Sequence, residues 1–298
     1  MPSSPGTGDY RAYVSVHPSG ALPHTTHRVP ALLRSCHPEP AVAVTVFVTC
    51  LAVVAGRGVT GTVAVAVAVL SGQLSIGWCN DAADAQRDMT CGRGDKPVGT
   101  GEIPRWAAFG AAGTALGLCV PLSLLSGVAA GAAHLGGVAA GWTYNLRLKH
   151  TALSPLPYAV GFGSLPPFVT LGLHPSSWPA WWAVTAGALL GVGAHLVNVL
   201  PDIEDDLATG VRGLPHRLGP RACRWLAPFI MLTAVGVLVA GPSGAVGVTG
   251  WTLAAAASVA VGGTAVPYQA GSRWPFRAAI LVAGIAVAQL LLRGADMT

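Results

Sequence analysis

Charged side chains are scarce in this sequence of 298 residues: they make up 10% of it, whereas 52% of the residues are hydrophobic. Soluble domains have roughly a quarter of their residues charged. The mean hydropathy of +0.56 and the long uncharged stretches of Ala, Val, Leu and Gly instead indicate a chain whose surroundings are a lipid bilayer. The composition therefore excludes an ordinary soluble protein.

Several common site patterns are also missing. The six cysteines contain no CxxC pair, and the nine histidines contain no HxxxH or HExxH arrangement, so neither a zinc site nor a redox pair is predicted. No basic stripe alternates with aromatic residues, so the net charge of +5 does not predict a nucleic-acid partner.

The first 40 residues differ in composition from the rest. They are rich in Ser, Pro, Gly and His, and they lack the basic start and apolar core of a cleaved signal peptide. Because they offer little apolar surface to offset the entropy of ordering, we predict a flexible cytoplasmic N-terminal tail at 1–40. The remaining residues, 41–298, are predicted to form one transmembrane domain.

Hydropathy predicts an all-α fold, a polytopic membrane bundle of about nine transmembrane helices. Pro, Gly and charged residues separate the apolar segments. These segments lie near 41–56, 58–79, 104–119, 124–146, 155–173, 179–200, 222–241, 246–266 and 276–293.

Basic residues fix the orientation of such a bundle, because Lys and Arg accumulate on the cytoplasmic side. With the N-terminus inside, 15 of the 17 Lys and Arg residues fall in cytoplasmic segments, and only Arg57 and Arg293 do not. We therefore expect a multi-pass protein of the plasma membrane with its N-terminus in the cytoplasm.

Acidic residues gather at two of the cytoplasmic connections. Of the 12 Asp and Glu residues, nine lie either at 81–102, after the second span, or at 202–206, after the sixth. Ionisable residues at the membrane-embedded ends of helices usually mark function. Both clusters are expected on the same face of the bundle.

The spacing within these clusters predicts a metal site. Asn80, Asp84 and Asp88 follow an i, i+4, i+8 pattern that keeps them on one helix face, and Asp202 and Asp206 repeat the i, i+4 step. Like charges at this spacing repel, which favours a bound cation between them. Carboxylate and amide oxygens suit Mg²⁺, which often shares its ligands with substrate phosphates. Two facing rows would clamp a diphosphate.

The same residues resemble a known family. The stretch from Asn80 to Asp88 resembles the NDxxDxxxD signature of the UbiA superfamily of intramembrane prenyltransferases, and Asp95-Lys96-Pro97 through Gly101 resembles the segment that follows it. Asp202 through Asp206, with a later Gly and Arg, is similar to the second DxxxD motif of that family. One departure is that Leu148 stands where a family YxxxK element starting at Tyr144 has its Lys.

The resemblance implies a helical bundle around a central cavity. It implies Mg-dependent transfer of an isoprenyl group from an isoprenyl diphosphate to an aromatic or other small nucleophilic acceptor within the membrane, with release of diphosphate. By the motif match, Asp84, Asp88, Asp202 and Asp206 are the expected catalytic residues, and together with Asn80 they are the expected Mg²⁺ ligands. The cations expected to bind the diphosphate are Lys96, Arg147, Lys149 and Arg212. The secondary candidates are Asp81, Asp205, Tyr144 and Asn198.

Two other functions start from the same residues. A terpene cyclase of the same superfamily ionises the same substrate, so the Asp motifs do not separate cyclisation from transfer. An ion-coupled carrier also binds cations through intramembrane Asp residues, but no inverted repeat is visible and both acidic clusters lie on one side. No obligatory protein partner is inferred; the expected partners are the two substrates and the bilayer.

Overall fold

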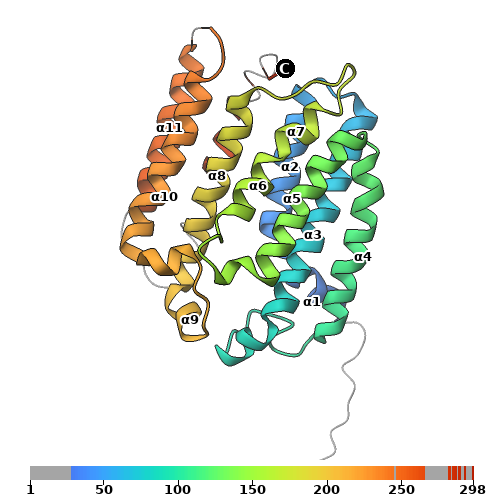
Figure 1. Ribbon diagram of the computed structural model, residues 1–298, viewed down its shortest axis with the longest axis vertical. Helices are drawn as coiled ribbons and strands as arrows, with labels where there is room; N and C mark the ends of the chain where they lie inside the picture. The colour runs from blue at the N-terminus through green and yellow to red at the C-terminus, as the bar shows by residue number, and fades with distance from the viewer. Residues whose placement is uncertain are drawn as a thin grey trace, which may run out of the picture.

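The computed structural model describes residues 28–244 and 246–265, together with 281–282, 284–286, 288–289, 292 and 297–298. Its described part is entirely helical, without a strand. Figure 1 shows the longer helices running side by side along the vertical axis of the molecule. The bounds are α1 Arg28–Ser35, α2 Pro38–Val54, α3 Val59–Thr90, α4 Arg105–Leu124, α5 Val128–Leu146, η2 Leu148–His150, α6 Leu156–Gly163, α7 Leu165–Thr170, α8 Trp181–Val199, η3 Leu200–Asp202, α9 Ile203–Ala208, α10 Leu214–Ala240 and α11 Val248–Ala265.

Two long helices organise the bundle. α3 packs against α2, α4 and α5, whereas α8 packs against α6 and α10. Small residues permit the closest approaches. At Gly77 of α3, for example, a Cβ atom would overlap the backbone carbonyl of Cys36, which lies between α1 and α2.

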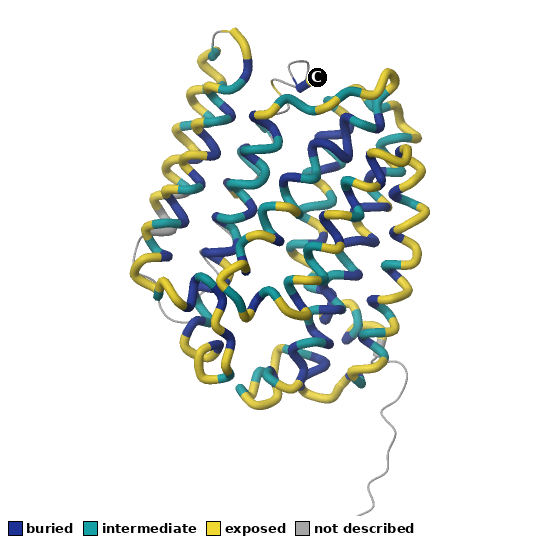
Figure 2. Tube along the Cα trace, viewed as in Figure 1, coloured by how far each residue is buried: buried dark blue, intermediate teal, exposed yellow. Residues whose placement is uncertain are grey.

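Many large apolar side chains are exposed on the outer surface. Figure 2 shows, for example, that the outer face of α4 is exposed. Leu118 of α4, Val46 of α2 and Trp251 of α11 are 57%, 49% and 59% exposed. Within the described residues, four helices qualify by length and composition as membrane spans, or up to five if the bent pair α1 and α2 counts as one. The described helices therefore fit a lipid environment, but they do not establish nine spans.

The predicted spans differ from the helices in extent and in continuity. The span predicted at 58–79 continues as α3 to Thr90, and the span predicted at 155–173 is divided into α6 and α7. Pro166 and Pro167 follow this division directly, where proline fits the first turn of a helix but not its interior. The span predicted at 276–293 lies mostly outside the described residues.

The predicted end of the N-terminal tail at residue 40 is also different. α1 is a helix, with Ala31 fully buried, and the indole Nε1 of Trp78 donates a hydrogen bond of 2.8 Å to the carbonyl of Leu32. Arg34 adds an ion pair of 2.6 Å with Glu102. Residues 28–40 therefore belong to the bundle, because these contacts with α3 and the loop after it offset the entropy of ordering. The prediction for residues 1–27 lies outside the described residues.

Candidate functional site

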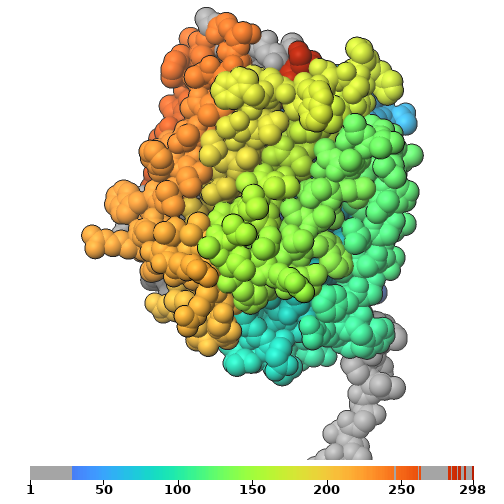
Figure 3. Space-filling view, viewed as in Figure 1, coloured from blue at the N-terminus to red at the C-terminus, as the bar shows by residue number. Residues whose placement is uncertain are grey.

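The fold brings the two acidic clusters to the same end of the bundle. In Figure 1 the connection after α3 lies at the lower end, next to α9, and Figure 3 shows the two segments adjoining on the surface. Two ion pairs join them: Arg93 with Asp202 at 2.7 Å, and Arg87 with Asp206 at 3.2 Å. Motifs more than 100 residues apart in the sequence thus form one polar cluster.

A cavity of about 840 Å³ extends from this cluster into the bundle. Its polar end is lined by side chains from α3, α9, η2 and the loop after α3. Toward the interior its walls are mainly apolar or small residues of α2, α3, α5, α6 and α7, with the polar side chains Gln73 and His134 among them; the apolar and small residues are Val44, Ile76, Gly137, Val138, Gly141, Gly161, Phe162 and Leu165. A ligand with a charged head and an apolar tail matches this division.

Asp84 is the centre of the first row. Its carboxylate accepts hydrogen bonds from the Asn80 amide at 3.3 Å and from Arg87 at 2.9 Å, and it forms an ion pair with Lys149. The Asn80 amide also donates to Asn145 of α5 at 3.2 Å. α3 presents this row because it continues as a helix beyond its apolar part, while η2 places the buried Lys149 opposite.

The second row lies at the end of α8. Asp202 ends η3, and Asp206 lies in the short helix α9, where its carboxylate is 3.0 Å from Nε2 of His216. Glycine at 219 adopts a φ of 79° just before Pro220, so that α10 bends there and its first turn carries His216 back toward α9. Burial alone lowers the pKa of Arg93, but its hydrogen bond with Asp202 raises the pKa above its ordinary value.

The structure separates the predicted site residues into three groups. Eight lie on the cavity wall: Asn80, Asp84, Lys96, Tyr144, Lys149, Asn198, Asp202 and Asp206. Asp81 and Asp88 are buried but are not on the wall. Arg147, Asp205 and Arg212 are exposed and also lie off the wall. Of the two cations flanking Leu148, Lys149 therefore faces the cavity and Arg147 does not.

Asp81 belongs to a separate polar contact beside the main row. It accepts a hydrogen bond of 3.0 Å from Lys96, whose Nζ is also 3.0 Å from the ring of His37. His37 has a left-handed backbone, with φ of 56°, and joins α1 to α2. Lys96 thus connects the loop after α3 with the start of α2, at the rim of the cavity.

Polar residues that were not predicted as site residues also line the cavity. Arg87 and Arg93 line the cavity, but in the sequence they contribute only to the basic charge that sets the orientation. Arg87 nevertheless lies within the first motif, one helical turn from Asp84. That spacing was a usable signal. Asn145 and His216 carried no such signal, because only the packing of α5 and the bend of α10 bring them to the Asp rows.

The oxygen donors of the two Asp rows imply Mg²⁺ as the cation. They fit Mg²⁺ only if a bound ligand supplies some of the atoms that coordinate it. In the described residues no three His, Cys, Asp or Glu side chains are placed to hold a metal by themselves. Instead, Arg and Lys side chains pair with the carboxylates of the two rows. They thereby balance the repulsion between carboxylates that, in the sequence, favours a bound cation. Both carboxylate oxygens of Asp88 are nevertheless buried without a hydrogen-bond partner there. Such oxygens suit Mg²⁺, which commonly takes one or two carboxylates alongside phosphates.

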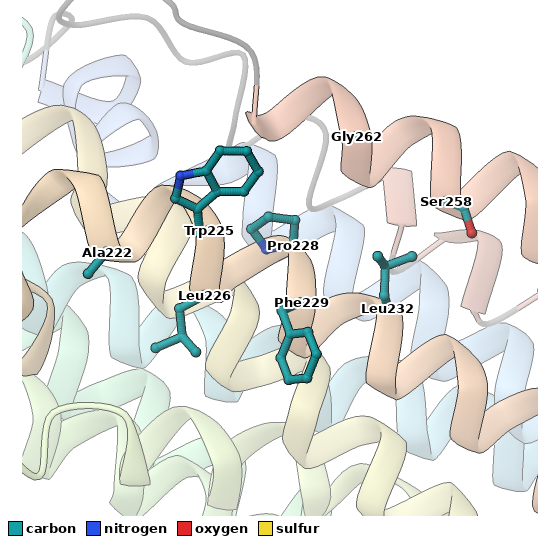
Figure 4. Close-up of a pocket in the computed structure, with 8 residues that line it drawn as sticks. All are labelled: Ala222, Trp225, Leu226, Pro228, Phe229, Leu232, Ser258 and Gly262. Atoms are coloured by element: carbon teal, nitrogen blue, oxygen red, sulfur yellow. The ribbon is translucent and has the colours of Figure 1, made fainter.

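A second hollow lies on the outside of the bundle, between α10 and α11. Figure 4 shows Trp225, Phe229 and Leu232 of α10 beside Ser258 and Gly262 of α11. Among the described residues, no charged side chain lines this groove of about 700 Å³. The inner cavity, which does have charged side chains on its wall, is therefore the candidate site.

Comparison with known proteins gives concordant matches. Residues 41–291 match the UbiA prenyltransferase family. A 185-residue segment is 32% identical to the bacteriochlorophyll synthase 33 kDa chain of Cereibacter sphaeroides, covering 56% of this chain and 58% of that relative. The match therefore spans little more than half of the relative's length.

Solved structures show the same fold. A UbiA homolog from Archaeoglobus fulgidus bound to GPP and Mg²⁺ superimposes with a TM-score of 0.66 at 14% identity, covering 87% of this chain and 97% of that one. The apo structure of a UbiA homolog from Aeropyrum pernix K1 gives 0.64 at 18% identity, covering 86% and 98%. At these identities the likeness concerns the fold alone.

Proposed function

This chain belongs to the UbiA prenyltransferase family and is an integral membrane protein, and on that premise we propose that it transfers an isoprenyl group from an isoprenyl diphosphate to a small nucleophilic acceptor. One observation carries the proposal: a single cavity joins two Asp rows and several cations at one end to apolar walls at the other. That combination is complementary to a diphosphate head and a hydrocarbon tail.

Magnesium is proposed as the shared cation. Asn80, Asp84, Asp88, Asp202 and Asp206 are the oxygen donors that would hold it, and the A. fulgidus homolog, solved with GPP and Mg²⁺, supports this choice. When bound, the metal neutralises charge on the departing diphosphate and so makes it a better leaving group.

The cations of the chain bind the remaining phosphate oxygens in this proposal. Lys149 is buried beside Asp84, Lys96 lies at the rim, and Arg93 reaches in from the loop after α3. Each donates charge-assisted hydrogen bonds, which are stronger than neutral ones and strongest where water is excluded. They hold the diphosphate at the polar end, with the allylic carbon directed toward the apolar walls.

Two tyrosine rings line the cavity. Tyr144 and Tyr158 both line the cavity and meet edge to face, with their ring centroids 5.1 Å apart, and the ring of His195 lies 4.7 Å from that of Tyr158. The faces of aromatic rings attract cations within about 6 Å. We infer that these two tyrosines stabilise the allylic cation and keep water away from it until the acceptor attacks.

In this proposal the small residues on the apolar wall set the length of isoprenyl tail that fits in the cavity. A substitution at Gly161 tests this. A Cβ at Gly161 would meet only the carbonyl oxygen of Gly137, at 3.9 Å, so a larger side chain there projects into open cavity. Gly161→Leu is expected to lower turnover of geranylgeranyl diphosphate at least about ten-fold more than that of dimethylallyl diphosphate. The measurement is kcat/KM for each substrate.

The control for this prediction is Gly161→Ala, which adds one methyl group and should change the ratio little. Equal losses on the short and the long substrate in Gly161→Leu would show that the side chain perturbs the fold and does not shorten the tail pocket.

Transfer and cyclisation are separated by the acceptor. The test is diphosphate release from geranyl, farnesyl and geranylgeranyl diphosphates, with Mg²⁺, in the absence and presence of phenolic and naphthoic acids and other small nucleophiles. Release that depends on an acceptor supports prenyl transfer. Release without an acceptor, giving a cyclic hydrocarbon or alcohol, replaces transfer by a terpene cyclase, and no release under any condition contradicts both.

The location of the reaction follows from the charge pattern. We propose that the protein lies in the plasma membrane with its N-terminus and both Asp motifs on the cytoplasmic side, because the loop after α3, the loop after α9 and the start of α10 carry basic residues at the same end of the bundle. Residues 41–298 then form the prenyltransferase domain, preceded by the α1 segment.

A further inference from the structure

Arg87 contacts three of the five proposed metal ligands. One guanidinium nitrogen donates to Asp84 at 2.9 Å and lies 3.7 Å from Asp88, and the other lies 3.2 Å from Asp206. Its side chain is 21% exposed, and it lines the cavity. A single side chain of α3 therefore bridges the two Asp rows.

Neighbouring side chains contact other oxygens of the Asp rows. Lys149 pairs with the second oxygen of Asp84 and Arg93 pairs with Asp202, while Nε2 of His216 lies 3.0 Å from the second oxygen of Asp206. A divalent ion placed between the rows would meet the guanidinium of Arg87 at close range. Like charges repel strongly in a partly buried setting, so Mg²⁺ and Arg87 compete for the same carboxylates.

We propose that Arg87 occupies the place of Mg²⁺ between the two Asp rows until a diphosphate arrives, and then turns to bind the diphosphate. This inference rests on the proposed function. The planar guanidinium fits carboxylate and phosphate equally well, so the exchange replaces one set of charge-assisted hydrogen bonds by another. Without a diphosphate, no other anion is available to Arg87. If Mg²⁺ then displaced Arg87 from the carboxylates, the partly buried guanidinium would be left unpaired.

The consequence is that Mg²⁺ and the diphosphate bind interdependently. Each raises the affinity of the protein for the other, and by thermodynamic linkage the two factors are equal. Mg²⁺ alone binds weakly to the wild-type protein, and Arg87 is the residue that makes it weak. Arg87 thus couples the binding of the two ligands.

The test measures Mg²⁺ binding to the purified full chain by titration calorimetry, with and without inorganic pyrophosphate. In the wild type, pyrophosphate is expected to tighten Mg²⁺ binding at least about ten-fold, a typical coupling. In Arg87→Gln, Mg²⁺ alone is expected to bind at least about ten-fold more tightly than in the wild type, because the competing charge is gone. The factor by which pyrophosphate tightens Mg²⁺ binding should therefore be smaller in Arg87→Gln than in the wild type.

Two further variants make the result specific. Arg105→Gln is the matched control: Arg105 also contacts α3, through the carbonyl of Ala82 at 2.9 Å, but its hydrogen bond involves no carboxylate, so wild-type coupling is expected. Arg87→Lys keeps the charge without the fork that spans two carboxylates, and an intermediate Mg²⁺ affinity is expected. Melting temperatures show that each variant is folded.

The outcomes separate this inference from the proposed function. If Mg²⁺ with pyrophosphate binds the wild type but Arg87→Gln and Arg87→Lys leave the Mg²⁺ affinity unchanged, the role of Arg87 is wrong and the diphosphate site stands. Wild-type Mg²⁺ binding that is equally tight with and without pyrophosphate also overturns it. If pyrophosphate and Mg²⁺ together do not bind the wild type at all, the diphosphate site itself is wrong.

Discussion

Replacement of Asp84 by Asn is expected to lower turnover of an isoprenyl diphosphate at least about a hundred-fold, the usual effect of removing one group that stabilises charge in a transition state. Asp84 lies on the cavity wall, where Asn80, Arg87 and Lys149 converge on it. The substitution removes a proposed metal-binding oxygen and the partner of a buried Lys. The measurement is diphosphate release at saturating Mg²⁺ and substrate.

A companion variant separates catalysis from stability. Asp84→Asn leaves the buried Lys149 without its carboxylate, which costs about 3–5 kcal/mol when an ion pair is broken on one side only. Asp88, in contrast, has no hydrogen-bond partner for either oxygen among the described residues, and only Arg87 at 3.7 Å as a paired cation. Asp88→Asn is therefore expected to lose turnover without a lower melting temperature.

The exposed Glu204 of α9 provides the control, because Glu204→Gln changes the charge of the second cluster without touching the cavity. Its turnover is expected to match that of the wild type. Near-normal turnover of both Asp84→Asn and Asp88→Asn would contradict the assignment of the first motif to the diphosphate site.

Removal of divalent cations is expected to have the second large effect. A metal at a departing phosphate stabilises the transition state by several kcal/mol. Removing it should therefore lower the rate by about a thousand-fold or more. The Asp rows offer oxygen donors only, so a hard cation should restore the activity. The experiment is turnover in excess EDTA, followed by titration with Mg²⁺ and, separately, with Zn²⁺.

Recovery with Mg²⁺ and not with Zn²⁺ is the expected pattern, since no His or Cys ligand set is present among the described residues. Melting curves in EDTA control for loss of structure. Full turnover in excess EDTA would contradict the cofactor assignment, even if the Asp variants behaved as expected.

The sequence predicted the fold class and most helix positions because hydropathy reports burial in lipid directly. Hydropathy ended the second span at residue 79, because a helix end is set by hydrogen bonding and not by hydropathy, whereas the spacing of Asn80, Asp84 and Asp88 predicted that the helix continues. The division between α6 and α7 was missed for the same reason, although Pro166 and Pro167 were visible. α1 was missed because its stability comes from contacts with α3 and the loop after it, which composition does not reveal.

The site was predicted unevenly. Helical spacing predicted that Asn80, Asp84 and Asp88 share one face. Asn80 and Asp84 lie on the cavity wall together with Asp202 and Asp206, whereas Asp88 is buried off the wall. Spacing did not distinguish Lys149 from Arg147, because the choice depends on how η2 turns after α5. Nor did it reveal that protein cations, above all Arg87, would balance the carboxylates in place of a metal.

The central claim is that the two Asp rows hold a diphosphate through Mg²⁺ at the polar end of the inner cavity. Its most direct test is a structure of the protein determined with Mg²⁺ and an unreactive thiolo analogue of geranyl diphosphate. The account predicts the diphosphate between α3 and α9, with metal density at Asp84 and Asp202 and the tail along Gly137 and Gly161. A diphosphate bound elsewhere, or bound there with both Asp rows still paired to Arg87 and no metal, would contradict it.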